Sequence, residues 1–258
     1  MIDHTTALYC IVDDLLKAVG HREDARCEMT DAEVITAALV AAFDFGGNIE
    51  RSRSFLQETG LMPRMLSRSR LNRRLHAVAG LVNSLFHQLG MVLKEASVSA
   101  KYLLDSFPVP VCDNMRISRC RLVRDGEFRG CVASKRRYFY GVRVQVVTTE
   151  EGIPVEFCFL PGAASDVRAL GVLPLCLPAG GQLFMDSGYT DYATEDAAAE
   201  MDGVEFAPSR KSNSKRGDDC WRSYYKQLMR KRIETVFSQI SPACCRSRFM
   251  RSHSTAFC

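Results

Sequence analysis

The chain has 258 residues, of which 47% are hydrophobic and 25% are charged. This balance is ordinary for a globular protein with a packed core and excludes a fully disordered chain. No apolar run approaches the ~20 residues of a membrane span, and the chain start lacks the basic residues and apolar block of a signal peptide. The sequence therefore predicts a cytoplasmic protein with no membrane contact.

Positive charge is concentrated in the later part of the chain. Residues 1–63 carry 11 acidic and 5 basic side chains, a balance of −6, whereas residues 64–258 carry 19 acidic and 29 basic ones, a balance of +10. Such a split is typical of proteins that bind a polyanion, although any single basic cluster could also be a solvated face.

The eleven cysteines include no Cys-x-x-Cys pair, and their spacing fits no zinc ribbon. Several stand in apolar runs, among them Cys10, Cys158 and Cys176, where a free cysteine behaves as a small buried hydrophobe. We expect reduced thiols rather than a metal site.

The first 97 residues predict a helical N-terminal domain. Apolar residues recur at helical spacing over 8–19. Thr30 and Glu33 form a capping box at the start of a helix that Gly46 ends. A third helix is predicted at 49–58, and a longer one begins near Ser67 or Ser69.

The start of that last helix is rich in arginine, and no acidic residue occurs between residues 59 and 94. Helix-turn-helix modules use such short basic helices to contact DNA, whereas the alternative is an ordinary solvated helix. The candidate DNA-binding residues of this region are Arg68, Arg70, Arg73 and Arg74.

Residues 98–241 predict a second domain, in which strands and helices alternate. Strands are expected at 102–105, 139–148, 155–160, 183–186 and 204–207, and helices at 166–175, 193–201 and 221–240. This order predicts a mixed α/β sheet flanked by helices. Residues 242–258 show no periodicity and are expected to form an irregular tail.

Three carboxylates stand in unusual contexts. Asp105 and Asp186 each follow three apolar residues and precede a segment expected to turn the chain, and Glu234 lies beside the apolar stripe of the last helix. Functional groups gather at strand ends in open α/β sheets. Three such carboxylates could bind two Mg²⁺ or Mn²⁺ ions for phosphodiester chemistry. Alternatively, the aspartates cap turns and Glu234 pairs with Arg230 one helical turn back.

Several blocks of the sequence resemble, in order, those of insertion-sequence DDE transposases. They are Leu103-Leu104-Asp105-Ser106, Tyr140-Gly141-Val142-Arg143-Val144, Leu160-Pro161-Gly162 with Ser165-Asp166, Asp186-Ser187-Gly188-Tyr189, Pro208-Ser209-Arg210-Lys211 and Arg232-Ile233-Glu234-Thr235-Val236-Phe237. The upstream residues 67–76 resemble the DNA-binding region of one such group.

The resemblance implies an RNase H-like fold with Asp105, Asp186 and Glu234 as the metal-binding triad. It also implies two Mg²⁺ (or Mn²⁺) ions, double-stranded DNA of the element ends and target as partner, and a homodimer in the active complex. In such enzymes water and then a freed 3′-hydroxyl attack DNA phosphates. Members of the family continue beyond the glutamate helix with further apolar segments, so we expect this chain to be C-terminally shortened and inactive, with Phe237 and Ile240 partly exposed.

Further residues could assist this chemistry. The run from Arg210 to Arg232 holds nine basic residues, including Lys211 and Arg230, interleaved with Trp221, Tyr224 and Tyr225. It could track a DNA backbone and stack a base, or be an exposed loop followed by ordinary helix packing. Asp166 could orient the metal site or simply cap a helix.

Two other functions fit the same sequence. One is a metal-dependent nuclease of the same fold, which would cut DNA strands without joining them. The other is a DNA-binding protein whose catalytic core has decayed. Terminal inverted repeats flanking the gene would favour the transposase.

Overall fold

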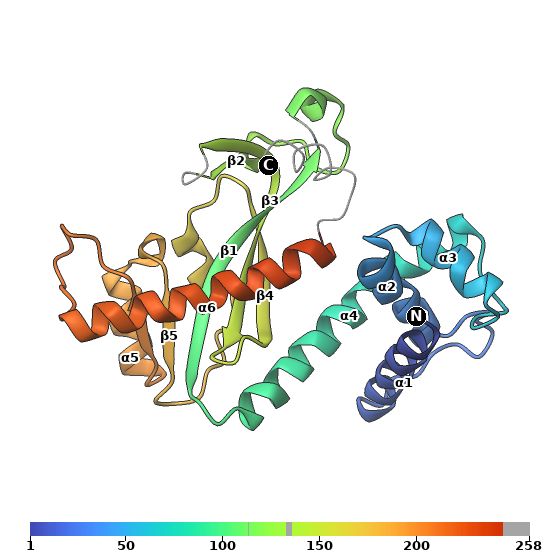
Figure 1. The fold of residues 1–258 in the computed structure, drawn as a ribbon, viewed down its shortest axis with the longest axis horizontal. Coiled ribbons are helices and arrows are strands. Elements are labelled where there is room, and N and C mark those ends of the chain that lie inside the picture. The colour runs from blue at the N-terminus through green and yellow to red at the C-terminus, as the bar shows by residue number, and fades with distance from the viewer. Residues whose placement is uncertain (113, 133–135, 245–258) are drawn as a thin grey trace. The chain divides into compact units, whose positions relative to one another are not determined.

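The computed structural model describes residues 1–112, 114–132 and 136–244 (Figure 1). The chain divides into two compact units, the smaller of which contains Met1–Phe86, while the larger spans His87–Ser238. Most of the predicted tail, from residue 245 onward, lies outside the described residues.

The smaller unit is helical, as predicted. It holds α1 (Ile2–Ala18), α2 (Asp31–Phe45), α3 (Ile49–Glu58) and the first part of α4 (Arg68–Ala96). The capping box is confirmed, because the Glu33 amide donates to the Thr30 hydroxyl at 3.1 Å and the Thr30 amide to the Glu33 carboxylate at 2.7 Å. Gly46 ends α2 with a φ of 59°, a left-handed conformation that favours glycine.

The larger unit is built on one mixed six-stranded sheet. Its strands are β1 (Lys101–Cys112), β2 (Arg129–Val132), β3 (Arg137–Thr149), β4 (Pro154–Pro161), β5 (Gln182–Met185) and β6 (Glu205–Pro208). The strand order is β2-β3-β1-β5-β6, with β4 also pairing with β3. The pairs β1–β5 and β5–β6 are parallel, and the pairs of β3 with β1, β2 and β4 are antiparallel.

Strand β1 is longer than its sequence predicts. We expected the chain to turn at Ser106-Phe107-Pro108, but β1 continues to Cys112 and pairs with β3 over most of that length. Strand β5 pairs with β1 only as far as Leu104. Beyond that residue one edge of β1 is free, and a free edge tolerates residues such as Pro108 and Pro110 that have no amide proton.

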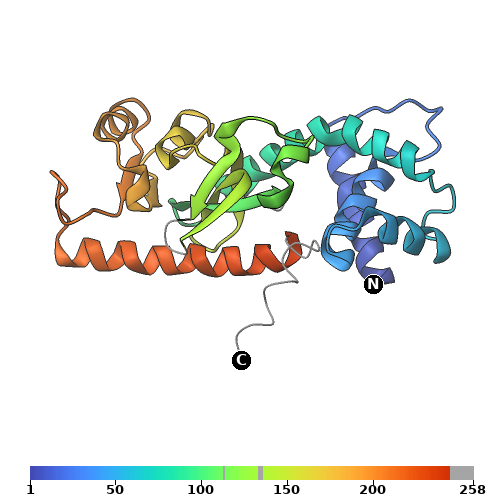
Figure 2. The same cartoon turned by 90° about the horizontal axis from the view of Figure 1, so that it is seen from above.

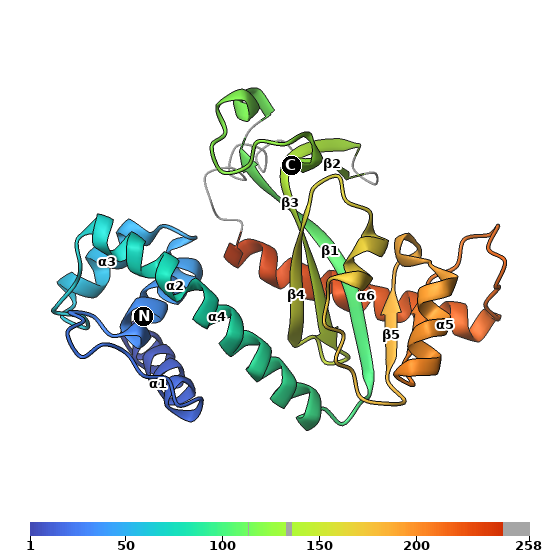
Figure 3. The ribbon, with the colours of Figure 1, turned by 180° about the vertical axis from the view of Figure 1, so that it is seen from behind.

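Helices cover both faces of this sheet (Figure 2). On one face α6 (Cys220–Cys244) packs Met229 and Ile233 against Leu103, Phe184 and Ala207. The other face is covered by the 3₁₀ helix η4 (Asp166–Gly171), by α5 (Tyr192–Met201) and by Leu93 near the end of α4, as the rear view in Figure 3 also shows. The helix predicted at 166–175 is therefore a shorter 3₁₀ turn.

The apolar stripe of α6 is partly covered. Phe237 is half-buried and makes an edge contact with Phe107, with ring centroids 5.1 Å apart. This agrees with the expectation that Phe237 is partly exposed, whereas the side chain of Ile240 lies outside the described part of the structure.

Cys10 and Cys176 were expected to be buried, but both are exposed thiols. Apolar neighbours in the sequence do not fix which face of an element a residue occupies. In the described part of the chain, no single helix is long and apolar enough to cross a membrane. Only the α2–α3 pair meets that test by length and composition, across a bend of 108°.

Candidate active site

The two aspartates lie side by side at one edge of the sheet. Leu104 of β1 pairs with Met185 of β5 in the parallel register, and Asp105 and Asp186 are the next residues on the two chains. Neighbouring strands are about 4.8 Å apart, so the Asp105 and Asp186 carboxylates lie close together at the end of the β1–β5 pairing. Asp105 accepts a hydrogen bond from the Ser106 amide at 2.8 Å, and Asp186 one from the Ser187 amide at 2.7 Å.

The third carboxylate, Glu234, is linked to Asp186 through Arg230. Arg230 of α6 donates from Nη1 to Asp186 Oδ1 at 3.0 Å, and its Nε lies 3.4 Å from Glu234 Oε1. The predicted alternative contact of Glu234 with Arg230 is thus present. Glu234 was expected at the edge of the buried face, but its side chain is 60% exposed, because Ile233 and Val236 take the inward positions of the helix.

A small pocket at this edge of the sheet is lined among others by Asp105, Asp186, Lys226 and Arg230, but not by Glu234. Its free volume is about 10 Å³, roughly the space of one water molecule. Among the described residues, no three His, Cys, Asp or Glu side chains converge closely enough to hold a metal ion. Arg230 occupies the position where a cation would neutralise the acidic cluster.

Asp105 is strongly affected by this environment. Burial, the largest cause, and the negative charge of Asp186 raise the pKa of its carboxyl, the Ser106 amide and Arg230 lower it, and the net result is a pKa of about 6. A carboxylate that is costly to ionise without an added cation is suited to binding one.

The metal-free protein should therefore be stabilised by Asp105→Asn at neutral pH. The carboxyl ionises near pH 3.8 in the unfolded protein and near pH 6 in the folded protein. Below pH 4 it is protonated in both states and costs no stability, whereas above pH 6 it is ionised in both states and the folded state bears the full cost of the buried charge. At pH 7.5 the variant should be more stable by up to about 3 kcal/mol, since one pKa unit corresponds to about 1.4 kcal/mol. Chemical denaturation at pH 7.5 and 4.5 in EDTA measures this. If Asp105→Asn raised the free energy of unfolding by the same amount at both pH values, this prediction would be wrong.

Asp166 lies directly behind the two aspartates. Its Oδ1 accepts hydrogen bonds from the Ser106 hydroxyl at 3.2 Å, Arg143 at 3.2 Å and Gln145 at 3.4 Å. A Cβ at Gly188 would lie 2.9 Å from the Asp166 carboxylate, which explains a glycine two residues after Asp186. No side-chain hydrogen bond caps η4, so Asp166 contacts the site rather than capping its helix.

A buried polar network extends from Asp166. The Tyr189 hydroxyl donates to the side chain of Gln145, and both residues are almost completely buried. Burial raises the pKa of Tyr189, and the charges of Asp166 and Asp105 raise it further. Arg143 and Gln145 were not among the site residues predicted from the sequence. The signal was present, because polar residues inside the apolar run Val142–Val147 are costly unless they are hydrogen-bonded.

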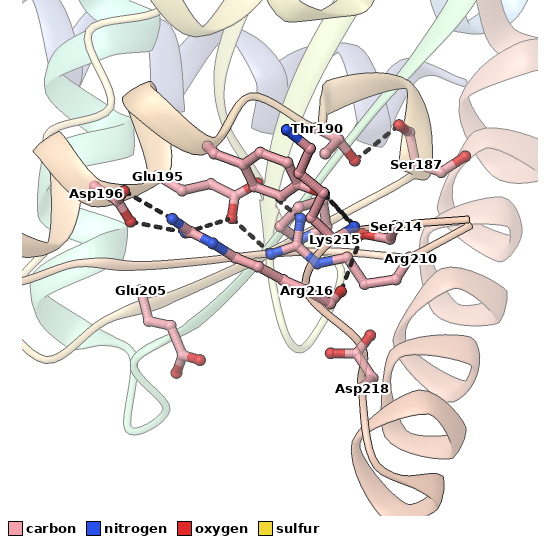
Figure 4. Close-up of polar contacts among 12 residues, drawn as sticks. Ser187, Thr190, Glu195, Asp196, Glu205, Arg210, Ser214, Lys215, Arg216 and Asp218 are labelled. Atoms are coloured by element: carbon pink, nitrogen blue, oxygen red, sulfur yellow. Dashed lines mark hydrogen bonds and ion pairs between the residues drawn. The ribbon is translucent and has the colours of Figure 1, made fainter. Parts of the chain in front are cut away.

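The basic run 210–232 is largely neutralised within the chain. Arg210 forms a bidentate pair with buried Glu195 at 2.9 and 2.6 Å, and Arg216 pairs with Asp196 at 2.7 and 2.8 Å (Figure 4). Lys226 pairs with Asp218 at 2.7 Å. Lys211 is exposed. Several basic side chains of this run therefore form ion pairs that stabilise the loop and the helix in which they lie.

The aromatic residues of this run differ in their exposure. Trp221 and Tyr224 are exposed, as base stacking would require. Tyr225 instead packs on Phe184 and accepts a hydrogen bond from Lys101, so it belongs to the sheet packing.

Of the four arginines at the start of α4, two form ion pairs within the described residues and two do not. Arg70 pairs with Glu28 at 3.0 Å, and Arg74 with Asp31 at 2.8 Å. Arg68 and Arg73 are exposed, and neither forms an ion pair within the described ranges. An open pocket of about 490 Å³ is lined by Arg70, Arg73 and Arg74, together with Arg26.

A family model described as a transposase DDE domain matches residues 95–254 of the chain. No curated protein matches the chain, and no solved structure does. The matched range includes Asp105, Asp186 and Glu234, of which Asp186 and Glu234 contact Arg230.

Proposed function

The chain belongs to the transposase DDE domain family, and from this premise we propose that it is the DNA transposase of an insertion sequence. In this proposal its RNase H-like domain catalyses metal-dependent cleavage of DNA strands and their transfer to a target. The observation that carries the proposal is the placement of Asp105 and Asp186 at the ends of adjacent parallel strands, with Glu234 linked to Asp186 through Arg230.

Asp105, Asp186 and Glu234 would hold the divalent ions on which this family generally relies. Carboxylate oxygens are the ligands that Mg²⁺ and Mn²⁺ prefer, and the buried, hard-to-ionise Asp105 fits a site that takes up positive charge. When two ions are bound, they supply activation of the attacking oxygen and stabilisation of the leaving one.

Arg230 would have to leave its present position for this chemistry. The pocket of about 10 Å³ offers roughly the space of one water molecule beside the guanidinium, too little for two ions with their other ligands. Arg230 lies on an exposed part of α6 with half of its side chain accessible, so a rotamer change can free Asp186 and Glu234. The guanidinium can then pair with a DNA phosphate, for which its planar fork is well suited.

Asp166 would act as a positioning residue. Its hydrogen bond to the Ser106 hydroxyl fixes the residue that follows Asp105, and its contact with Gly188 supports the turn that follows Asp186. Partners that orient metal ligands in this way commonly contribute 10–100-fold to metal affinity or activity.

The arginine-rich start of α4 would bind the DNA backbone. We expect the double variant Arg68→Gln/Arg73→Gln to lower the slope of log K against log salt by about 2, because each lost phosphate contact releases about one counterion fewer. Titration of duplex DNA from 50 to 200 mM salt measures the slope. The matched control is Arg53→Gln, whose guanidinium is paired with Glu50 at 2.7 Å and whose loss should leave the slope unchanged. An unchanged slope in the double variant would show that these arginines do not touch phosphates.

Arg210, Lys211 and Arg230 complete the proposed DNA-binding set. Of these, Lys211 is available without breaking an internal ion pair, whereas Arg210 would first have to leave Glu195. We propose that Arg210 mainly shapes the loop and that Lys211 makes the direct contact. The active complex is proposed to be a homodimer, in which each site acts on one element end.

A strand-transfer assay tests the proposed function. A duplex with the inverted repeat that flanks the gene and a precut 3′ end is incubated with supercoiled target plasmid and Mg²⁺. The transposase predicts covalent joining of the donor end to the plasmid, lost in Asp105→Asn. Nicking of DNA without joining would instead indicate the nuclease, and binding of the repeat without any cleavage would indicate a decayed core.

A further inference from the structure

Seven arginines gather in the connection between β1 and β3. We call this segment, residues 114–132 with Arg136 and Arg137, the arginine tip. Its described residues include only two acidic side chains, Asp125 and Glu127. The arginines are Arg116, Arg119, Arg121, Arg124, Arg129, Arg136 and Arg137.

These arginines differ from most others in the larger unit. All seven are exposed, and none forms an ion pair or a side-chain hydrogen bond with another described residue. Elsewhere in the unit, by contrast, arginines are paired with carboxylates, as in Arg143 with Asp166, Arg216 with Asp196 and Arg232 with Glu150. Positive charge of this density, left without internal counter-charges, repels itself and is suited to binding a polyanion.

The arginine tip is attached to the sheet rather than hanging free. The Tyr140 hydroxyl donates to the carbonyl oxygens of Val123 at 3.3 Å and Asp125 at 3.2 Å, and the Ala163 amide donates to Glu127 O at 2.8 Å. Phe128 packs its ring edge-on against Tyr140, with centroids 6.4 Å apart. These contacts hold residues 123–128 of the tip against the sheet, and the Asn114 side chain donates to the Tyr138 carbonyl oxygen at 3.4 Å at the start of the tip. Such anchoring lowers the entropy lost on binding.

The sheet also sets the distance of the tip from the carboxylates. From Asp105 to Cys112 strand β1 runs antiparallel to β3, and the tip lies at the far end of this strand pair (Figures 1 and 3). At about 3.3 Å per strand residue, the far end is about 23 Å from Asp105. DNA rises about 3.4 Å per base pair, so this span corresponds to about seven base pairs.

We propose that the arginine tip binds the sugar–phosphate backbone of duplex DNA about seven base pairs from the phosphate held at Asp105 and Asp186. This inference rests on the proposed function, which supplies the DNA. The tip would fix the direction in which the duplex leaves the catalytic pocket. Because contacts to phosphates carry no sequence information directly, this binding would not depend on the base sequence.

Salt dependence of DNA binding gives the first test. The triple variant Arg116→Gln/Arg119→Gln/Arg121→Gln should lower the salt slope by about 2.7, because each phosphate contact contributes about 0.9. The matched control is Arg168→Gln, which should leave the salt slope unchanged. It removes an exposed arginine of the same unit that also has no ion pair among the described residues. Because the replaced side chains are exposed, the melting temperature should be unchanged in both.

Photo-crosslinking tests where along the duplex the arginine tip binds. Leu122 is 80% exposed within the tip, and Met201 is 83% exposed at the end of α5, so each can be replaced by p-benzoylphenylalanine without removing an arginine. Leu122 should form an adduct centred about seven base pairs from the cleavage site, and Met201 should form none. If the wild-type protein binds the duplex but the triple variant keeps its slope and Leu122 gives no adduct, the tip is not a DNA surface and the proposed function still stands. If the wild-type protein does not bind DNA at all, both proposals are overturned.

Discussion

Asp186→Asn should lower Mg²⁺-dependent cleavage of duplex DNA carrying the flanking repeat by more than about a hundredfold. The change removes one charged ligand from the carboxylate pair at the ends of β1 and β5, and loss of a direct ligand should exceed the 10–100-fold effect typical of residues that only support ligands. Binding of the same duplex should remain within about threefold in EDTA. Gel-resolved cleavage of end-labelled DNA measures the rate.

Glu205→Gln is the matched control. Glu205 is also an ion-paired carboxylate of this sheet, contacting Arg222 and Gln182, but it stands at the beginning of β6, whereas Asp186 follows the end of β5. The cleavage rate of this variant should equal that of the wild-type protein. Cleavage by Asp186→Asn at more than about a tenth of the wild-type rate would show that Asp186 is not a metal ligand.

Lys94→Met should destabilise the protein by about 3–5 kcal/mol, the usual cost of leaving one member of a buried ion pair alone. The Lys94 ammonium lies 2.5 Å from Glu156, and the two side chains are only 6% and 2% exposed. Glu156 also accepts a hydrogen bond from the Leu175 amide at 2.9 Å. The pair therefore joins the end of α4 to β4 and to the chain after η4. Urea denaturation at pH 7.5 measures the free energy of unfolding.

Two further variants separate charge from packing. Lys94→Met/Glu156→Gln should recover part of the loss, because the buried charge is removed while the amide oxygen of the new side chain can still accept from the Leu175 amide. Lys17→Met removes a lysine that pairs with Asp13 on the surface, with 70% of its side chain exposed, and should hardly change stability. Equal losses in Lys17→Met and Lys94→Met would contradict the assignment of the large effect to burial.

The helical parts of the fold could be read from the sequence because local signals determine them. The capping box at Thr30 and Glu33 and the glycine at 46 set the two ends of α2. The length of β1 could not be read in this way. Pro108 normally ends a strand, and only the pairing of β1 with β3, which comes much later in the chain, and its free edge beyond Leu104 allow the strand to continue.

The candidate site was predicted in part. Asp105 and Asp186 stood out because each ends an apolar run, and the parallel register then placed them together. The position of Arg230 between Asp186 and Glu234 depends on how α6 packs on the sheet, which no local pattern reveals. The arginine tip was missed for a similar reason, since its importance lies in the absence of ion-pair partners among the described residues and in its distance from Asp105 along β1.

Localisation of Mn²⁺ by anomalous diffraction, in crystals grown with repeat DNA and Mn²⁺, tests the central claim most directly. We predict manganese between Asp105 and Asp186, ligated also by Glu234, with the Arg230 guanidinium moved away from both of its present carboxylate partners. Manganese absent from this pocket, or Arg230 still bridging Asp186 and Glu234 in the DNA complex, would contradict the claim that these three carboxylates form the metal site of a transposase.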